Sequence, residues 1–186
     1  LFDRLNVELG WMTSFYKTVS DLEFRDSGET YEYTEFNQYY NKPELQATYR
    51  WTDQHHSVFG TGLVLEDLDA ERYPGQPDFT TNFVYLQHSW IPSQKLEVTG
   101  GFRFDGHSEY SSQISPKFSA RYNHTDRIQL RGSIGRGFKA PEFRQLFLNF
   151  NNSTAGYSVF GSSTVREGIE RLQNEGNIDQ VLIPIT

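Results

Sequence analysis

Apolar and polar side chains alternate along most of the chain with a period of two, which is typical of β-strands. In residues 96–104, for example, Val98, Phe102 and Phe104 share one side, with Glu97 and Arg103 on the other. Comparable patterns occupy residues 5–11, 45–51, 57–66, 83–91, 114–122 and 128–135. Both sides of 57–66 are partly apolar, and His88 interrupts the apolar side of 83–91. The pattern predicts an all-β protein of about seven strands, folded as an antiparallel up-and-down meander.

The connections between these strands alternate in length. Turn-forming residues predict short turns near Asp53, Pro92 and His124, and longer loops near Gly28, Gly75, Gly106 and after Pro141. Because every second connection of a meander lies at the same end, the short turns gather at one end and the long loops at the other. This asymmetry is typical of outer-membrane β-barrels. The polar, tyrosine-rich residues 31–41 have no apolar side, and we expect an exposed loop or the extended top of a strand.

The last quarter of the chain loses the strand pattern. We interpret residues 137–186 as one long extracellular loop, in which Glu142–Phe150 forms a short helical turn and Asn149–Gly161 an irregular segment. Thr164 and Glu167 have the spacing of a capping box, which predicts a helix near residues 164–175 that ends at Gly176. The fold class therefore includes a short helix in the last long loop.

The alternation alone leaves two interpretations open. A soluble antiparallel sheet buries its apolar side in a core, whereas a transmembrane barrel turns that side to lipid and its polar side to water. The soluble alternative is a carbohydrate- or ligand-binding β-module, whose apolar side would have to close into a core within these residues. A passive porin is a second alternative.

Composition excludes some classes of protein. The net charge of −7 argues against a nucleic-acid partner, and the absence of cysteine excludes disulfides and thiolate sites. No apolar run is long enough for a transmembrane helix, although a strand crosses with about 9–11 residues. No set of acid–base groups or metal ligands converges, and the adjacent His55 and His56 point apart in an extended chain. We therefore predict no enzyme, no catalytic residue, no metal and no cofactor.

Residues 131–141, RGSIGRGFKAP, resemble the mid-barrel signature of TonB-dependent outer-membrane receptors. Three upstream segments are similar to other motifs of the same family, in the same order: Tyr85–Gln87, Gly100–Asp105 and Ile114–Ser119. The strand pattern stops at residues 137–141, which we interpret as a structural corner. Gly137 permits an unusual backbone angle there, and Pro141 keeps Ala140 out of a helix. The structural motif positions are Arg131, Gly135, Gly137, Phe138, Lys139, Ala140 and Pro141.

The resemblance implies a 22-stranded transmembrane β-barrel in the bacterial outer membrane, with an N-terminal plug that this chain lacks. Residues 1–186 would be part of that barrel, and both chain ends suggest a piece of a longer protein. The family imports scarce nutrients with energy from the TonB complex, which acts through the plug. The implied partners are the TonB complex, outer-membrane lipid and a small nutrient, here a ferric siderophore or similar iron complex. The last loop is similar to Bacteroidetes receptors of the siderophore and cobalamin type.

The family's ligand contacts are not fixed motif residues, so candidates come from residue type alone. Aromatic rings and a cationic side chain in the long loops would suit the binding of an anionic iron complex. Our candidates are Arg72, Tyr73, Tyr110 and Tyr157.

Overall fold

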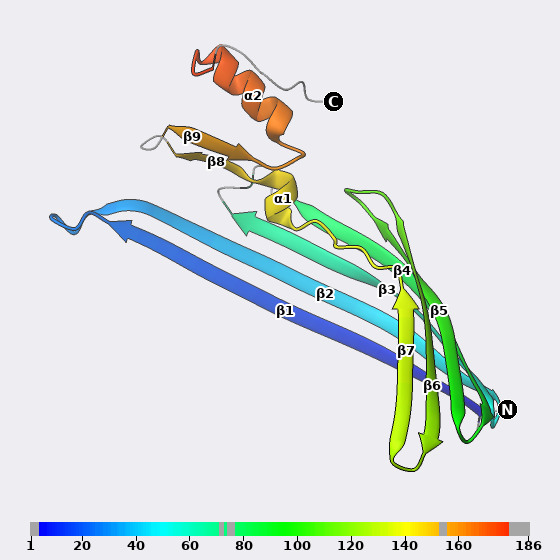
Figure 1. Ribbon diagram of the computed structural model, residues 1–186. Helices are drawn as coiled ribbons and strands as arrows, with labels where there is room; N and C mark the ends of the chain where they lie inside the picture. The colour runs from blue at the N-terminus through cyan, green and yellow to red at the C-terminus, as the bar shows by residue number, and fades with distance from the viewer. Residues whose placement is uncertain (1–3, 71–72, 74–76, 153–155, 179–186) are drawn as a thin grey trace. The chain divides into compact units, whose positions relative to one another are not determined.

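A computed structural model describes residues 4–70, 73, 77–152 and 156–178, with only the backbone described at 31 and 32. Seven strands form one sheet in sequence order (Figure 1). The strands are β1 (Leu5–Glu23), β2 (Thr30–Thr52), β3 (His55–Ala70), β4 (Asp78–Ser93), β5 (Leu96–His107), β6 (Gln113–Thr125) and β7 (Ile128–Gly135). Helix α1 (Phe143–Phe147), the hairpin β8 (Asn149–Asn152) and β9 (Tyr157–Phe160), and helix α2 (Val165–Asn174) follow. The predicted all-β meander with a short helix in its last connection is confirmed.

None of the helices in the described part of the chain is long and apolar enough to cross a membrane.

The connections differ at the two ends of the strands, as predicted. Residues 53–54, 94–95 and 126–127 are two-residue turns, and the connections at the other end are longer. Two of the loops, near Gly75 and Gly106, are shorter than predicted, because β3 continues to Ala70, β4 begins at Asp78 and β5 continues to His107. Residues 31–41 belong to β2. Of the two alternatives predicted for them, the extended top of a strand is therefore right and the exposed loop is wrong. Tyrosine and threonine favour extended backbone even where no apolar side marks the strand.

Contacts divide the chain into two compact units. Unit 1 comprises Leu1–Ser14, Tyr39–Glu66 and Phe79–Lys139, and unit 2 comprises Phe15–Gln38, Asp67–Asp78 and Ala140–Thr186. Strands β1, β2 and β3, and β4 through its first residue Asp78, therefore contribute residues to both units.

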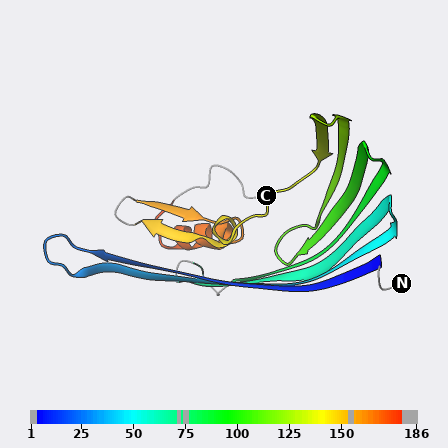
Figure 2. The ribbon, with the colours of Figure 1, turned by 90° about the horizontal axis from the view of Figure 1, so that it is seen from below.

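Within unit 1 the sheet is curved (Figure 2), and its two sides differ in chemistry. On the apolar side, Phe102 lies opposite Leu86 on one neighbouring strand and Pro116 on the other. This side is open to its surroundings: the exposed fractions of Leu9 and Ile134 are 81% and 75%. The described residues of unit 1 do not close this side into a core, which contradicts the expectation for a soluble β-module.

His88 lies on the apolar side of β4, and its polar atoms are used there. Its Nε2 lies 3.1 Å from Nδ1 of His55, and its Nδ1 lies 2.8 Å from Oγ of Ser57. Trp51 Nε1 donates to the same Ser57 Oγ at 2.9 Å. The chain of hydrogen bonds explains how a histidine interrupts an apolar pattern without leaving an unsatisfied polar group.

The polar side of unit 1 carries an aromatic and ionic cluster around Phe83, whose side chain is 1% exposed. The guanidinium carbon of Arg103 lies 4.0 Å from the ring centre and Nζ of Lys42 5.4 Å. Each cation also has a carboxylate partner. Arg103 Nη2 lies 2.7 Å from Oδ1 of Asp105, and Lys42 Nζ lies 2.7 Å from Oε2 of Glu44. We call this group the Phe83 cluster, and its charges balance.

The corner after β7 is not fixed by the backbone angle of Gly137, as the sequence predicted. Gly137 is not among the glycines with positive φ, and a Cβ there would meet no atom within 4 Å. The expected backbone requirement at Gly137 is therefore wrong. The corner is held instead by the Arg136 amide, which donates to the Pro116 carbonyl at 2.9 Å. The Phe138 ring makes an edge contact with Tyr110, with centroids 6.4 Å apart.

The last part of unit 2 is more ordered than predicted. Asn149–Gly161 is not an irregular segment, because β8 and β9 pair as an antiparallel hairpin there. The predicted capping box of α2 does not form: Thr164 makes no side-chain cap and its hydroxyl donates to the Leu148 carbonyl at 2.8 Å. The Gly161 amide donates to the same carbonyl at 2.7 Å. These bonds tie the start of α2 to the end of α1.

Helix α2 packs tightly against β9 because Gly168 has no side chain. A Cβ at Gly168 would overlap the Phe160 ring. We expect Gly168→Val to weaken the docking of α2 by about 1–3 kcal/mol, the usual cost of overpacking. Hydrogen exchange of the α2 amides should rise accordingly. Glu167→Val, at the exposed neighbouring position, should leave this exchange nearly unchanged, and equal effects of the two substitutions would contradict the packing argument.

Candidate ligand site

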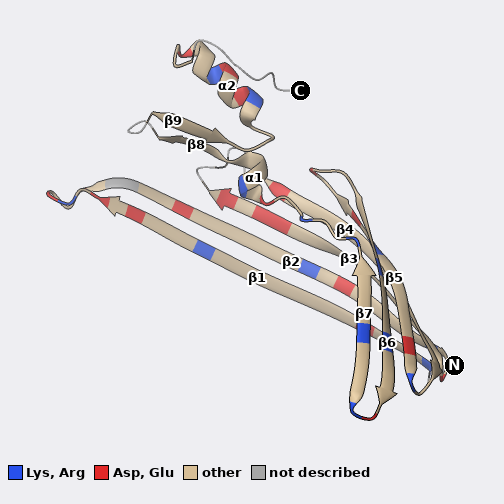
Figure 3. Cartoon of the chain, in the orientation of Figure 1, with Lys and Arg blue, Asp and Glu red and all other residues tan. Residues whose placement is uncertain are grey.

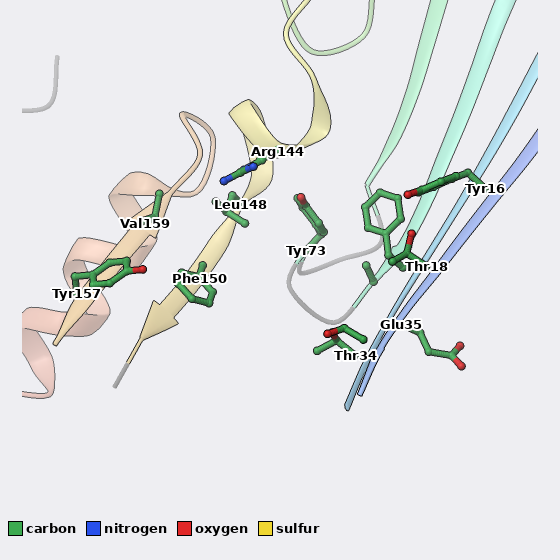
Figure 4. Close-up of a pocket in the computed structure, with 13 residues that line it drawn as sticks. Tyr16, Thr18, Thr34, Glu35, Tyr73, Arg144, Leu148, Phe150, Tyr157 and Val159 are labelled. Atoms are coloured by element: carbon green, nitrogen blue, oxygen red, sulfur yellow. The ribbon is translucent and has the colours of Figure 1, made fainter. Parts of the chain in front are cut away.

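Unit 2 contains a pocket of about 580 Å³ with two walls of different origin (Figure 4). One wall comes from β1, β2 and the end of β3, and the other from α1 and the β8–β9 hairpin. Most of the lining side chains are aromatic or aliphatic. The pocket therefore resembles in chemistry the mostly apolar clefts that bind small molecules.

The first wall is built by strand alternation. Tyr16, Thr18 and Ser20 are two residues apart on β1, and so they share one side of the strand. Phe36 on β2 makes an edge contact with Tyr16 at a centroid distance of 6.0 Å. Tyr73 continues the row, with its ring 6.1 Å from that of Phe36 and its amide donating to the Ala70 carbonyl at 2.9 Å. Three aromatic rings in edge-to-face contact thus form a continuous apolar surface.

The second wall is one side of the hairpin. Phe150 pairs with Val159 and Asn152 with Tyr157, so these four side chains leave the hairpin on the same side. Phe150, Tyr157 and Val159 line the pocket. The opposite side of the hairpin faces α2, where Arg171 Nη2 donates to Asn149 Oδ1 at 3.1 Å. Helix α2 thus packs on the side of the hairpin opposite to the pocket.

Ionised groups are sparse in the lining. Arg144 is the only cation among the described lining residues, and it makes no ion pair with the described residues. Glu35 is the only acidic residue among those described in the lining, and Figure 4 shows its carboxylate directed away from the other lining side chains. It accepts a hydrogen bond from the Tyr33 hydroxyl at 2.8 Å and lies 3.2 Å from Lys17 Nζ.

These contacts keep Glu35 ionised. The Tyr33 hydrogen bond, followed by the bond from Lys17, lowers the pKa of Glu35 below its usual range. Glu35 lies well beyond the 9–11 residues of β2 that a strand needs to cross a bilayer. Because its charge is already paired on the other side of the sheet, the unpaired Arg144 gives the pocket a positive character.

The four predicted ligand residues separate in the structure. Tyr73 and Tyr157 both line the pocket, on opposite walls. Arg72 lies outside the described residues. Tyr110 belongs to unit 1, where its ring stacks on His107 with centroids 3.6 Å apart. Burial, together with the charges of Asp105 and Glu66, raises the pKa of Tyr110, so its hydroxyl stays neutral at physiological pH.

Several pocket residues were not anticipated from the sequence. Phe150 and Val159 were assigned to an irregular loop, although Phe150/Asn152 and Tyr157/Val159 alternate as strand residues do. Arg144 was assigned to a helical turn without a role. Tyr16 and Phe36 lie in segments with no regular apolar pattern, and only their residue type could have suggested a ligand contact.

The side chains that line the pocket suit the binding of a ligand rather than catalysis. Aromatic walls hold a flat or aromatic ligand by stacking, and a guanidinium attracts negative charge. The described residues contain no group of three or more His, Asp or Glu side chains placed to hold a metal ion. The pocket can thus bind an anionic organic ligand, including one that carries its own metal.

Residues 3–169 match the family described as "TonB dependent receptor-like, beta-barrel". An iron-regulated outer membrane virulence protein of Vibrio cholerae serotype O1 is 22% identical over 82 residues, covering 44% of this chain and 13% of the relative. A ferric enterobactin receptor of Pseudomonas aeruginosa is 29% identical over 87 residues, covering 46% of this chain and 12% of the relative. The aligned segments are therefore small parts of those relatives.

Proposed function

The chain belongs to the TonB-dependent receptor-like β-barrel family, and we propose that the longer protein containing it imports an iron complex through the bacterial outer membrane. Proteins of this family are outer-membrane transporters and not enzymes. The named relatives are an iron-regulated outer membrane protein and a ferric enterobactin receptor, and we extend the iron-complex ligand to this chain. We further propose that import draws energy from the TonB complex, which acts through a plug.

One observation carries the choice of ligand: among its described residues, the pocket of unit 2 combines two aromatic walls with one unpaired cation, Arg144. A ferric siderophore of the catecholate type presents aromatic rings and a net negative charge around a buried iron. Stacking on Tyr73 and Phe150 and attraction to Arg144 would recognise both features. The iron is cargo here, held by the siderophore and not by protein side chains.

The membrane orientation follows as part of this proposal. We propose that the two-residue turns lie in the periplasm and that the longer connections, including residues 137–186, lie outside the cell. The Bacteroidetes origin suggested by the last loop stays a prediction, since the named relatives come from Vibrio and Pseudomonas.

The decisive experiment is uptake of radiolabelled ferric enterobactin by a receptor-deficient bacterium that expresses the full-length protein. We expect accumulation that stops when a protonophore collapses the inner-membrane gradient. Entry that continues with the protonophore would instead favour a passive porin. A lack of uptake for catecholate and hydroxamate iron complexes alike, in cells that display the protein at their surface, would reject the iron ligand.

A further inference from the structure

The polar side of unit 1 contains a second hollow, of about 450 Å³, between β5, β6 and β7. It shares no residue with the pocket of unit 2. Its charged side chains are Lys117, Arg121, Arg131 and Glu97. Figure 3 marks the charged positions along these strands. We call this feature the basic hollow.

Strand register explains why these side chains gather. Glu97, Arg121 and Arg131 lie opposite one another on three successive strands. The hydroxyl residues Thr99, Ser119 and Ser133 form the next row, and Lys117 lies between Gly101 and Gly135 in the row after that. The two glycines have no side chains of their own beside Lys117. The row of hydroxyl residues therefore lies between the row that holds Arg121 and Arg131 and the row that holds Lys117.

The charges of the basic hollow do not balance. Glu97 Oε2 lies 2.6 Å from Arg121 Nη2 and is the only carboxylate of the lining. Arg131 donates through Nε to the neutral Gln129 Oε1 at 2.7 Å, and Lys117 has no ion-pair partner among the described residues. The Phe83 cluster on the same side of unit 1 pairs each of its two cations with a carboxylate. The imbalance is thus a local property of the hollow and not a general property of the polar side.

This arrangement has a cost in the absence of an anion. Arg121 and Arg131 lie directly opposite on neighbouring strands, and like charges in such positions repel. A single glutamate compensates for only one of them. Arginine keeps further N–H donors when one nitrogen is engaged, and the serine hydroxyls add more. The hollow therefore offers several hydrogen-bond donors and an excess of positive charge to an anion.

We propose that the basic hollow binds a small oxyanion with two or more negative charges, of the carboxylate or phosphate class. Lys117 and Arg121 are four residues apart on β6, roughly 13 Å at the strand rise, while Arg121 and Arg131 are neighbours across about 5 Å. That spread suits an anion with several charged groups better than a single chloride ion. The inference concerns a site in unit 1 and holds whatever the cargo of the unit 2 pocket is.

Calorimetric titration of pyrophosphate and of citrate into the detergent-solubilised full-length protein tests this site. We expect saturable binding of at least one of them, which sodium chloride at equal ionic strength does not reproduce. Lys117→Gln and Arg131→Gln should each weaken binding about tenfold, since each removes a charge-assisted contact. Lys117→Arg should retain most of the affinity, which separates loss of charge from loss of fold.

A control variant removes the same unit of charge elsewhere. Lys42→Gln, in the Phe83 cluster, should change anion affinity less than about twofold, because long-range attraction is screened by salt. A loss with Lys42→Gln equal to that with Lys117→Gln would overturn the site, as would the absence of saturable binding to the wild-type protein. Neither result bears on iron-complex uptake, so the two proposals fail separately.

Discussion

Replacing Leu86 with arginine is expected to destabilise the folded barrel by about 2–4 kcal/mol, the cost of a cation on the lipid side near the bilayer centre. Leu86 lies on the apolar side of β4, opposite Phe102. Leu86 is five residues from Ile91, whose amide donates to the Gln54 carbonyl in the turn at 53–54, and it therefore lies close to the middle of a 9–11-residue spanning segment that begins at this turn. Guanidinium unfolding of the full-length protein in lipid vesicles measures the difference.

Gln87→Arg provides the matched control for Leu86→Arg. Gln87 is the next residue, lies opposite Gly101 and points to the polar side. The same new charge placed there meets water, so we expect a change in the free energy of unfolding within about 0.5 kcal/mol. If the two substitutions destabilised the barrel equally, the apolar side of the sheet would not be its lipid surface.

The second large effect is expected at the hairpin wall of the pocket. Phe150→Ala should weaken the binding of ferric enterobactin to the full-length protein by roughly 30-fold, since a buried aromatic anchor contributes about 2 kcal/mol to an interface. The substitution removes a ring from the pocket side of β8 and leaves the pairing of Phe150 with Val159 possible through the backbone. Quenching of intrinsic fluorescence by the iron complex follows the binding.

Asn151→Ala separates the role of the pocket from that of the hairpin. Asn151 is the next residue and faces the opposite side, where its Oδ1 accepts a hydrogen bond from Ser158 at 3.2 Å. We expect its loss to alter ligand affinity less than threefold, because an exposed hydrogen bond contributes about 1 kcal/mol or less. A ligand that bound both variants as tightly as the wild type would have to bind outside this pocket.

The sequence predicted the fold well where one side of a strand faces an apolar phase. Alternation located the strands at 96–104, 114–122 and 128–135 because a slip of one residue would expose every apolar side chain to the polar side. It failed at the far ends of β1 and β2, which are extended although no apolar side marks them. Backbone pairing is enough to hold such a strand, and pairing leaves no periodic signal in the side chains.

The candidate site was predicted only in part, for a related reason. Tyr73 and Tyr157 could be chosen by residue type, and both line the pocket. Phe150 and Arg144 could not, because the turn-formers after Asn151 suggested a loop. In the structure Asn152 is the last residue of β8, and Gly156, just before β9, has a φ of 70° and donates its amide to the Asn152 carbonyl at 2.8 Å. Turn-forming residue types beside so short a strand hide its alternation.

The two-residue turns have a consequence for the order in which the sheet assembles. Closing a short connection costs little chain entropy, and hairpins form in microseconds. The hairpins β2–β3, β4–β5 and β6–β7 each have such a turn, whereas the connections that join one hairpin to the next are longer. We therefore expect the sheet to be built from hairpins that form first and then associate edge to edge. On that route the longer connections are closed last, and the pocket residues that follow β7 take their places only after the strands beneath them have paired.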